Sequence, residues 1–307
     1  MALSSHAIKK RALELGFSAA GVVPAEKLSL ESERLRRWLN RGFAGTMGWI
    51  AHSFEKRVDP FVHMPDVRSI VCVALNYYTD HAMSDSPGRG KVSRYAWGDD
   101  YHDIVGERLR TLLSWIQQEE PSSHGKIAID TSPVMDKAWA AKAGLGWIGK
   151  HSNLIHTTFG SWVFLGELLL NLELDYDEQP IADQCGTCTA CLDACPTGAI
   201  VEPYVVDSNH CISYQTIESR AGTLAVDTEG WIYGCDICQD VCPWNHAPKL
   251  STEGRFQPRP EFLNPALDQA ADITSEEFQK LTKKSAIRRT RYSGWIRNAS
   301  HTAKSKA

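Results

Sequence analysis

The order of apolar and polar positions in residues 1–180 predicts helices that alternate with short strands. Helical periodicity predicts three helices, over residues 5–15, 28–40 and 103–118. Short apolar runs predict three buried strands, at residues 69–75, 126–130 and 162–170. Cys72 falls in the first of these strands and is most simply a core residue. Alternating helices and strands indicate an α/β or α+β fold class.

Two further helices are predicted from their start signals. Pro133 suits the first turn of a helix over residues 133–143, after one of the three polar residues that precede it as a cap. Thr274 and Glu277 have the spacing of a capping box, which predicts a helix over residues 274–284.

The chain is long enough for about two domains, at roughly 150 residues each. An acidic, proline-containing stretch at residues 173–183 looks like a linker between them. We predict an α/β domain over residues 1–180, a cysteine-rich domain over residues 181–250 and a helical, basic C-terminal segment over residues 251–307.

Charge is distributed unevenly along the chain. The formal net charge is −4, but the basic tail, residues 280–307, holds nine basic residues and no acidic one. The tail therefore carries +9, and the chain before it, residues 1–279, carries −13. This asymmetry indicates an acidic partner, with nucleic acid the obvious one, although a solvated basic helix end would give the same pattern.

Composition excludes several classes of protein. With 43% hydrophobic and 23% charged residues, the chain is ordinary globular material, neither disordered nor fibrous. No uninterrupted apolar run approaches the ~20 residues of a membrane span. The first residues show no export signal, so we expect a cytoplasmic protein.

Residues 144–149, Gly-Leu-Gly-Trp-Ile-Gly, satisfy the GxGxxG pattern of a dinucleotide-binding loop. That pattern requires a strand before it and a helix after it. Here an alanine-rich, helix-like stretch precedes it and a strand-like segment follows, so we do not expect a nicotinamide site. The sequence also contains no GxxxxGK[ST] phosphate loop.

Cysteines carry the most specific chemical signal. Eight of the nine lie between Cys185 and Cys242, which in a reducing compartment argues for metal rather than disulfides. The first four form the run Cys185-x2-Cys188-x2-Cys191-x3-Cys195-Pro196, the bacterial ferredoxin pattern for 4Fe–4S clusters. A shortened second run is Cys235-x2-Cys238-x3-Cys242-Pro243, with Cys211 between the two runs.

Eight thiolates make two sets of four. In two-cluster ferredoxins the fourth cysteine of each run binds the other cluster. We therefore assign one 4Fe–4S cluster to Cys185, Cys188, Cys191 and Cys242, and the other to Cys195, Cys211, Cys235 and Cys238. A pair of zinc sites is the alternative, because CxxC pairs also suit tetrahedral zinc. Two neighbouring clusters would form an electron conduit, which implies an acceptor in the predicted α/β domain.

Several motifs together resemble one family. They are Lys56-Arg57-Val-Asp59-Pro60, Val73-Ala-Leu-Asn-Tyr-Tyr78, Ser93-Arg-Tyr-Ala-Trp-Gly-Asp-Asp-Tyr-His102, Asp130-Thr-Ser-Pro133, Gly144-Leu-Gly-Trp-Ile-Gly-Lys-His-Ser-Asn-Leu154, Leu165-Gly-Glu167 and Cys211-Ile-Ser-Tyr214. Their order, with the ferredoxin run, is similar to that of the epoxyqueuosine reductases over roughly residues 5 to 298. No single motif decides the resemblance; the ordered set does.

The resemblance implies a fold, a reaction and cofactors. It implies a cobalamin-binding α/β domain like that of the reductive dehalogenases, beside a two-cluster ferredoxin-like domain. The reaction would reduce the epoxide of epoxyqueuosine in a tRNA anticodon loop to queuosine, with electrons from an external flavodoxin or ferredoxin. The partners would be that tRNA and the donor, with no membrane, and we expect a monomer.

The resemblance also implies site residues. Asp130 matches the proton donor of the family. Cobalamin contacts are expected from Arg57, Tyr95, Ala96, Trp97, Asp130, Lys150, His151, Ser152, Asn153, Ser213 and Asp236. Contacts to tRNA are expected from Lys283, Lys284, Arg288, Arg289, Arg291 and Arg297. Arginine and lysine can hold phosphates, while the interleaved Tyr292 and Trp295 can stack or pack.

The position of Asp130 in the chain also supports a role as proton donor, independently of the resemblance. It ends the predicted strand 126–130, and open α/β sheets bind ligands at strand ends. To donate a proton near neutral pH its pKa would need to be raised by an apolar environment. The alternative is that Asp130 caps the helix at Pro133. Asp136 is a rival carboxylate, but it lies within that predicted helix, which favours a structural role.

Two other functions are compatible with parts of the sequence. A reductive dehalogenase would use the same cofactors, but the missing twin-arginine signal, the Asp130 motif and the basic tail weigh against it. A ferredoxin-like electron carrier would not need the large α/β domain that precedes the cysteines.

Overall fold

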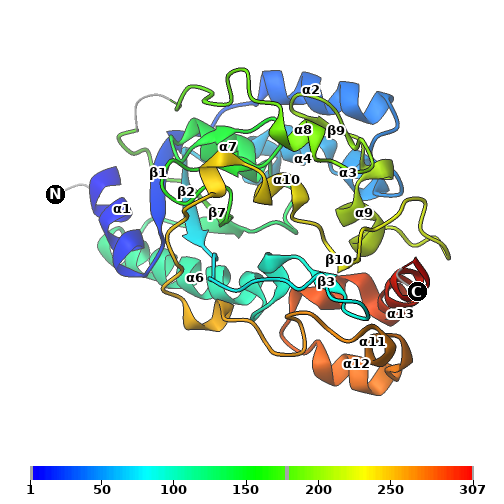
Figure 1. The fold of residues 1–307 in the computed structure, drawn as a ribbon. Coiled ribbons are helices and arrows are strands. Elements are labelled where there is room, and N and C mark those ends of the chain that lie inside the picture. The colour runs from blue at the N-terminus through cyan, green and yellow to red at the C-terminus, as the bar shows by residue number, and fades with distance from the viewer. Residues whose placement is uncertain (1–2, 177–179, 306–307) are drawn as a thin grey trace. The chain divides into compact units, whose positions relative to one another are not determined.

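The computed structural model describes residues 3–176 and 180–305 (Figure 1). Part of the predicted linker, residues 177–179, lies outside the described residues. The chain forms two compact units. Unit 1 comprises residues 1–41, 49–76 and 101–187, and unit 2 comprises residues 42–48, 77–100 and 188–307. These units are not contiguous stretches like the three predicted domains: unit 2 takes in two early segments of the chain and the whole C-terminal segment.

Unit 1 is built on a four-stranded sheet. Its strands, in spatial order, are β1 (Ala19–Pro24), β2 (Ser69–Asn76), β7 (Val163–Leu170) and β4 (Gly125–Ala128). The three predicted strands are confirmed, with ends shifted by one or two residues. Every neighbouring pair is antiparallel. The strand-end rule for parallel α/β sheets therefore does not apply, and that argument for Asp130 was wrong.

Helices cover both faces of this sheet. The confirmed helices α1 (Ser5–Glu14) and α6 (Tyr101–Glu119) pack on one face, and α7 (Asp136–Lys142) packs on the other. Gly166 of β7 faces α6, since a Cβ there would lie 2.9 Å from Val105 Cγ1 and 3.0 Å from Leu109 Cδ1. The remaining helices up to residue 63 are α2 (Ser29–Asn40), α3 (Gly48–His52), α4 (Phe54–Val58) and α5 (Pro60–His63).

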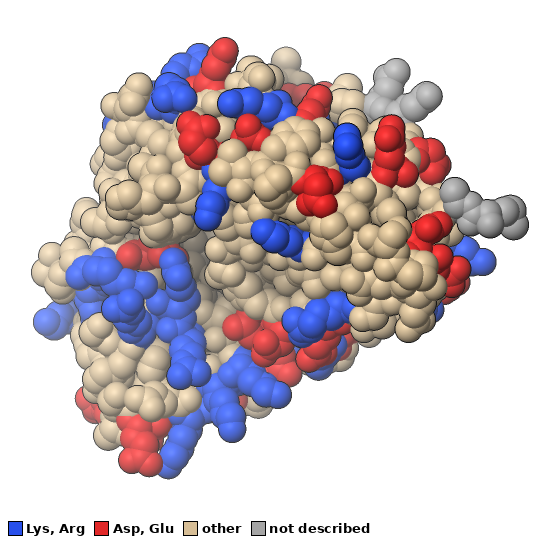
Figure 2. Space-filling model, turned by 180° about the vertical axis from the view of Figure 1, so that it is seen from behind, with Lys and Arg blue, Asp and Glu red and all other residues tan. Residues whose placement is uncertain are grey.

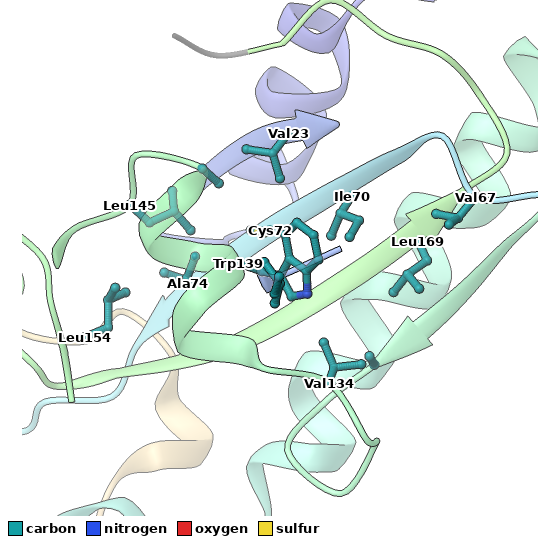
Figure 3. Packing of buried hydrophobic residues seen from close by; sticks show 14 of the residues in the cluster. Val23, Val67, Ile70, Cys72, Ala74, Val134, Trp139, Leu145, Leu154 and Leu169 are labelled. Carbon is teal, nitrogen blue, oxygen red and sulfur yellow. The ribbon is translucent and has the colours of Figure 1, made fainter. Parts of the chain in front are cut away.

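The apolar core between α7 and the sheet is continuous (Figure 3). Trp139 of α7 is 1% exposed and packs in one cluster with Cys72 and Ala74 of β2 and with Ala128 and Leu169 of the neighbouring strands. Cys72 is fully buried, as expected of a core residue. The hydrophobic free energy gained by burying these side chains is the main contribution that holds α7 on the sheet.

The helix predicted over residues 133–143 begins later, at Asp136, and ends at Lys142. Its start differs because residues 129–134 form a turn: the Ser132 N–H donates to Ile129 O, and the Val134 N–H donates to Ser132 O. Pro133 therefore lies outside the helix. The helix has no side-chain cap, so the alternative of Asp130 as a capping residue is wrong.

The GxGxxG segment has the context expected from the sequence. Helix α7 precedes it, and its last residues form β5 (Trp147–Ile148), which pairs in an antiparallel hairpin with β6 (Leu154–Ile155). A dinucleotide fold would require the reverse order of elements. None of the helices within the described ranges is long and apolar enough to span a membrane.

Unit 2 consists of short elements joined by loops. Its strands are β3 (Lys91–Val92), β8 (Ile200–Glu202), β9 (Val205–Val206) and β10 (Trp231–Tyr233), and its α-helices are α8 (Ala190–Asp193), α9 (Ile212–Ile217), α10 (Ile237–Asp240), α11 (Leu267–Asp272), α12 (Ser275–Leu281) and α13 (Arg291–Ser305). Its 3₁₀ turns are η1 (Arg94–Ala96), η2 (Ser208–His210), η3 (Pro243–Asn245), η4 (Gly254–Phe256) and η5 (Ala286–Thr290). The capping box of Thr274 and Glu277 is confirmed, but α12 ends at Leu281, three residues early.

Replacing Trp139 with alanine should lower the free energy of unfolding by about 3–5 kcal/mol, because the largest side chain of this core would leave a cavity. Urea denaturation followed by circular dichroism measures the change. Leu13→Ala is the matched control, since Leu13 is 50% exposed and should change stability by less than about 1 kcal/mol. Equal losses in the two variants would contradict this account of the core.

Candidate active site and cluster ligands

Asp130 lies two residues beyond the end of β4, with its side chain 62% exposed. The Tyr101 hydroxyl donates a 2.7 Å hydrogen bond to its Oδ2, and His102 Nε2 lies 3.4 Å from the same atom. Tyr101 begins α6 and stacks on Phe164 of β7 with ring centroids 4.2 Å apart. Tyr101 and His102 were not predicted as partners of Asp130, although they are the last two residues of the Ser93–His102 motif.

The backbone at Asp130 is in an unusual conformation. Its φ of +38° lies in the region that favours glycine. Such a residue costs on the order of 1–3 kcal/mol and persists only where its surroundings hold it. Here Ile129 O accepts hydrogen bonds from the Ser132 N–H at 3.2 Å and from Thr131 Oγ1 at 3.3 Å. The turn thus presents the Asp130 carboxylate instead of burying it, so the apolar environment expected of a proton donor is not found around it among the described residues.

Arg57 of α4 faces the same turn. Its Nε donates to Ser53 Oγ at 3.0 Å, and its Nη1 donates to Val134 O at 3.4 Å. Its guanidinium lies over the Trp49 ring, 5.0 Å from the centroid. Burial lowers the pKa of Arg57, and the nearby carboxylates of Asp136 and then Asp130 oppose that shift. Arg57 therefore stays a cation beside the turn.

The turn at residues 150–153 follows the hairpin strand β5. Burial, with a smaller contribution from Lys137, lowers the pKa of His151 to about 4, so its ring is neutral at pH 7. Its Nδ1 accepts the Asn153 N–H at 3.2 Å, which places the ring proton on Nε2. That Nε2 is buried and has no hydrogen-bond partner among the residues that the structure describes. A buried donor without an acceptor is suited to a ligand carbonyl such as a corrin amide.

Lysines hold the rest of this turn in place. Lys137 Nζ donates to Ser152 O at 2.8 Å and to Asn153 Oδ1 at 2.9 Å, while Lys150 Nζ donates to Gly186 O at 2.7 Å. Ser152 has a φ of +64°, a second strained position. Apart from Arg57 in α4, the predicted cobalamin contacts of unit 1 thus lie on two turns with a strained backbone, and the 150–153 turn carries a buried N–H without an acceptor among the described residues.

The predicted cobalamin contacts of unit 2 have partners within the protein. Asp236 is fully buried and accepts hydrogen bonds from Ser93 Oγ and the Arg94 N–H, both at 2.7 Å, and from Gln239 Nε2 at 3.0 Å. This network gives Asp236 a structural role. Trp97 is also fully buried, and its Nε1 donates to a backbone carbonyl.

The other predicted contacts of unit 2 differ in exposure. Ala96 is buried at 1% exposure. Tyr95 is partly exposed, and its hydroxyl donates to Tyr233 Oη at 3.1 Å. Ser213, in α9, is half-buried. Tyr95 and Ser213 are thus more accessible to a ligand than Ala96 and Trp97.

The cysteine thiols of unit 2 gather without forming disulfides. None of the nine cysteines, all of which lie in the described ranges, is joined in a disulfide. Burial raises the pKa of the Cys238 thiol, and Cys211, Cys191 and Cys195 are close enough to raise it further. Burial likewise raises the pKa of Cys235, with added contributions from Cys238 and Cys211. Thiols that lie close enough to shift one another's pKa in a buried region are a donor set suited to iron, which binds them as thiolates.

The described side chains contain no group of three or more His, Cys, Asp or Glu that could hold a single metal ion. A cubane cluster spaces its ligands more widely, because each thiolate binds a different iron. The assignment of the eight cysteines to two clusters stays a prediction.

The predicted tRNA contacts fall into two groups. Lys283, Lys284, Arg288, Arg289 and Arg291 are exposed. Figure 2 shows Lys and Arg side chains gathering on the side of the molecule where α12 and α13 lie. Arg289 also forms a two-bond ion pair with Glu218, at 2.7 and 2.8 Å.

Arg297 has a different environment from the exposed group. It is half-buried, and its guanidinium donates to the backbone carbonyls of Ser219, Ala221 and Gln215 at 2.7 to 2.9 Å. This geometry gives Arg297 a structural role in unit 2.

Comparison with known proteins identifies the family. A family model described as "Epoxyqueuosine reductase QueG, DUF1730" matches residues 57–131, and one described as "4Fe-4S double cluster binding domain" matches residues 184–245. The chain is 45% identical over 298 residues to an epoxyqueuosine reductase of Cellulophaga algicola and 48% identical over 297 residues to that of Leadbetterella byssophila. Each alignment covers 96% of both chains. The chain belongs to the epoxyqueuosine reductase family.

Solved structures of epoxyqueuosine reductases confirm the predicted fold class. One contains an epoxyqueuosine-modified tRNA-Tyr stem loop and has a TM-score of 0.87 and 31% identity, covering 97% of this chain and 80% of that one. The Bacillus subtilis enzyme, at a TM-score of 0.88, 30% identity and the same coverage, is described with its catalytic aspartate loop swung out of the active site. The double-cluster match confirms two 4Fe–4S clusters and rules against the zinc alternative.

Removing one predicted ligand should abolish one cluster. After anaerobic reconstitution, Cys238→Ala should bind about four irons per chain instead of about eight. Cys211→Ala/Cys238→Ala should also bind about four, because both ligands are assigned to one cluster, whereas Cys185→Ala/Cys238→Ala should bind almost none. Iron and sulfide analysis with electron paramagnetic resonance measures this.

Cys72→Ala is the matched control for these variants and should retain about eight irons, since Cys72 is a core residue of β2. Loss of both clusters in Cys211→Ala/Cys238→Ala, with Cys72→Ala intact, would contradict the pairing of ligands.

Proposed function

We propose that this protein reduces the epoxide of epoxyqueuosine in tRNA to the alkene of queuosine. The observation that carries the proposal is similarity to epoxyqueuosine reductases over 96% of the chain. A relative with 31% identity binds the modified tRNA stem loop in its solved structure. Reduction consumes two electrons and two protons: both carbon–oxygen bonds of the epoxide break, a carbon–carbon double bond forms, and the oxygen leaves as water.

Cobalamin and two 4Fe–4S clusters serve this reaction, and when bound they would supply the low-potential electrons that the reduction requires. In unit 1, Arg57 and the 150–153 turn are suited to hold the corrin through its amide groups. His151 offers a neutral, buried N–H for such an amide. Burial keeps this ring neutral throughout the physiological pH range, so the donor is constant.

Asp130 donates a proton to the departing epoxide oxygen. Two features of its surroundings support this role. Its strained turn presents the carboxyl group at the surface of unit 1. Tyr101 anchors one carboxyl oxygen, and α6 and Phe164 hold the Tyr101 ring in place. Asp130 can then point its other oxygen toward the substrate, while Tyr101 steadies the carboxylate that remains after proton transfer.

The exposed basic residues of the tail hold the tRNA backbone. Lys283, Lys284, Arg288, Arg289 and Arg291 carry the positive charge that phosphates require. An external flavodoxin or ferredoxin supplies the electrons, and the protein acts as a monomer in the cytoplasm, where its tRNA substrate resides.

The reduced protein, loaded with cobalamin and both clusters, should convert epoxyqueuosine-containing tRNA to queuosine-containing tRNA. Asp130→Asn should retain corrin absorbance but lose turnover by at least about 100-fold, because an amide cannot donate the proton that general acid catalysis requires. Mass spectrometry of digested nucleosides measures conversion.

Asp66→Asn is the matched control for Asp130→Asn, since Asp66 is an exposed carboxylate of unit 1 paired with His124. It should retain turnover. No conversion by the fully loaded native protein would overturn the proposed function, whereas a fully active Asp130→Asn variant would overturn only the donor role.

Arg288→Ala should weaken tRNA binding and flatten its dependence on salt by about one unit of log Kd per log salt, because one phosphate contact is lost. Filter binding at several salt concentrations measures this slope. Lys10→Ala, a change at an exposed lysine of α1, is the control and should leave the slope unchanged. If the slope of log Kd against log salt is the same for the native protein and for Arg288→Ala, Arg288 does not contact a phosphate of the tRNA.

A further inference from the structure

A pair of carboxyl groups, those of Asp136 and Glu167, lies near the Asp130 turn in unit 1. Glu167 sits in the middle of β7, opposite Cys72 of β2 and Ala128 of β4. Cys72 and Ala128 belong to the apolar cluster that α7 covers, so Glu167 points to the same face of the sheet. Asp136 is the first residue of α7. An acid is thus placed among apolar side chains, directly against a second acid.

Three of the four carboxyl oxygens are buried and receive no hydrogen bond from the described residues, although the Asp136 side chain as a whole is partly exposed. Glu167 is 0% exposed, and neither of its oxygens receives a hydrogen bond from the described residues. Asp136 Oδ1 is buried and lacks a donor as well. The two side chains are nevertheless in hydrogen-bonding contact with each other. Two carboxylates cannot bond, since neither has a hydrogen to donate, but one proton between them satisfies both.

The pKa shifts of the two acids agree with one proton held between them. Burial and the neighbouring Asp136 raise the pKa of Glu167 well above its ordinary value. Burial raises the pKa of Asp136 to about 6, with Asp130 adding to the shift and Glu167, Lys137 and Arg57 opposing it. One shared proton, with one negative charge left on the pair, is the state expected of two acids in contact at a buried site.

The remaining negative charge faces Arg57. Of the two carboxylates that act on the Arg57 guanidinium, Asp136 has the larger effect and Asp130 the smaller. An arginine beside a carboxylic acid normally favours loss of the acid's proton, which is the opposite of what a proton donor requires. A buried negative charge next to Arg57 cancels that influence. The groups that face the pair are Arg57, Asp130, Lys137 and the thiol of Cys72, and Asp130 itself also faces the Tyr101 hydroxyl and the His102 ring.

We propose that Asp136 and Glu167 share one proton, and that the single negative charge left on this pair neutralises Arg57 and so keeps Asp130 protonated for catalysis. The pair consists of positioning residues: it acts on the reaction through Arg57 and Asp130. This inference deepens the proposed function and rests on it for the catalytic consequence, but the shared proton itself is a property of the folded chain.

The first experiment observes the proton without catalysis. In infrared spectra at pH 7, the native protein should show the C=O stretch of a protonated buried carboxylic acid. Glu167→Gln should lose this band, because a glutamine amide donates to Asp136 and leaves it ionised. Asp136→Asn should keep a shifted band from Glu167, and the exposed Asp66→Asn should leave the band unchanged. A native protein without the band, or a Glu167→Gln protein that retains it, would overturn the shared proton.

The second experiment tests the effect on Asp130. In the pH profile of turnover, Asp136→Asn should move the alkaline decline to lower pH by about one unit, because Arg57 loses its counter-charge. Arg57→Gln/Asp136→Asn should return the decline toward its native position, since both charges are removed together. A purely structural role for Asp136 predicts added damage in the double variant and no return, and that result would overturn the proposal.

The two experiments distinguish a failure of the proposed function from a failure of the proposed effect of the carboxyl pair on Asp130. If the native protein has no turnover, the proposed function fails while the infrared result still decides the shared proton. If turnover is present but Asp136→Asn leaves the pH profile unmoved, the proposed function stands and the link between the pair and Asp130 fails.

Discussion

Strand β7 is the constraint on which the active site depends. It pairs with β2 on one side and β4 on the other, so both its edges are used, and helices cover both its faces. Gly166 leaves room for α6 to approach on one face, because any Cβ there would press on Val105 and Leu109. On the other face Glu167 lies under α7. At the start of the strand Phe164 stacks on Tyr101, which in turn binds Asp130.

Because β7 is held on all sides, the groups attached to it have little freedom. Tyr101 is the first residue of a 19-residue helix, and the position of that helix on β7 places the Tyr101 hydroxyl. The antiparallel register then brings β4 alongside and places the turn after it within reach of that hydroxyl. The cost of the left-handed backbone at Asp130 is offset by this surrounding rigidity. A strained side chain on a rigid support is a common arrangement in active sites.

Unit 2 has long loops and little secondary structure, so its backbone is ordered in another way than the sheet of unit 1. Buried polar side chains form hydrogen bonds with backbone groups that would otherwise pair between strands. Asp236 accepts the Arg94 N–H and the Ser93 hydroxyl, while Asn298 donates to Thr216 O and Ile232 O at 2.7 and 2.9 Å. Arg297 acts in the same way on three carbonyls. Each satisfied group is costly to remove, so these residues order the segments that carry the cysteines.

The sequence by itself determined the elements and chemistry that depend on local pattern: the strands at 69–75 and 162–170, the capping box at Thr274, the cysteine runs and the family. These follow from periodicity and spacing, which are properties of short segments. Only the tertiary structure decided that the sheet is antiparallel, that Arg297 and Asp236 have structural roles, and that Glu167 meets Asp136. Those outcomes depend on which distant residues become neighbours, and burial then sets the charge of an acid by removing its water, which no local pattern encodes.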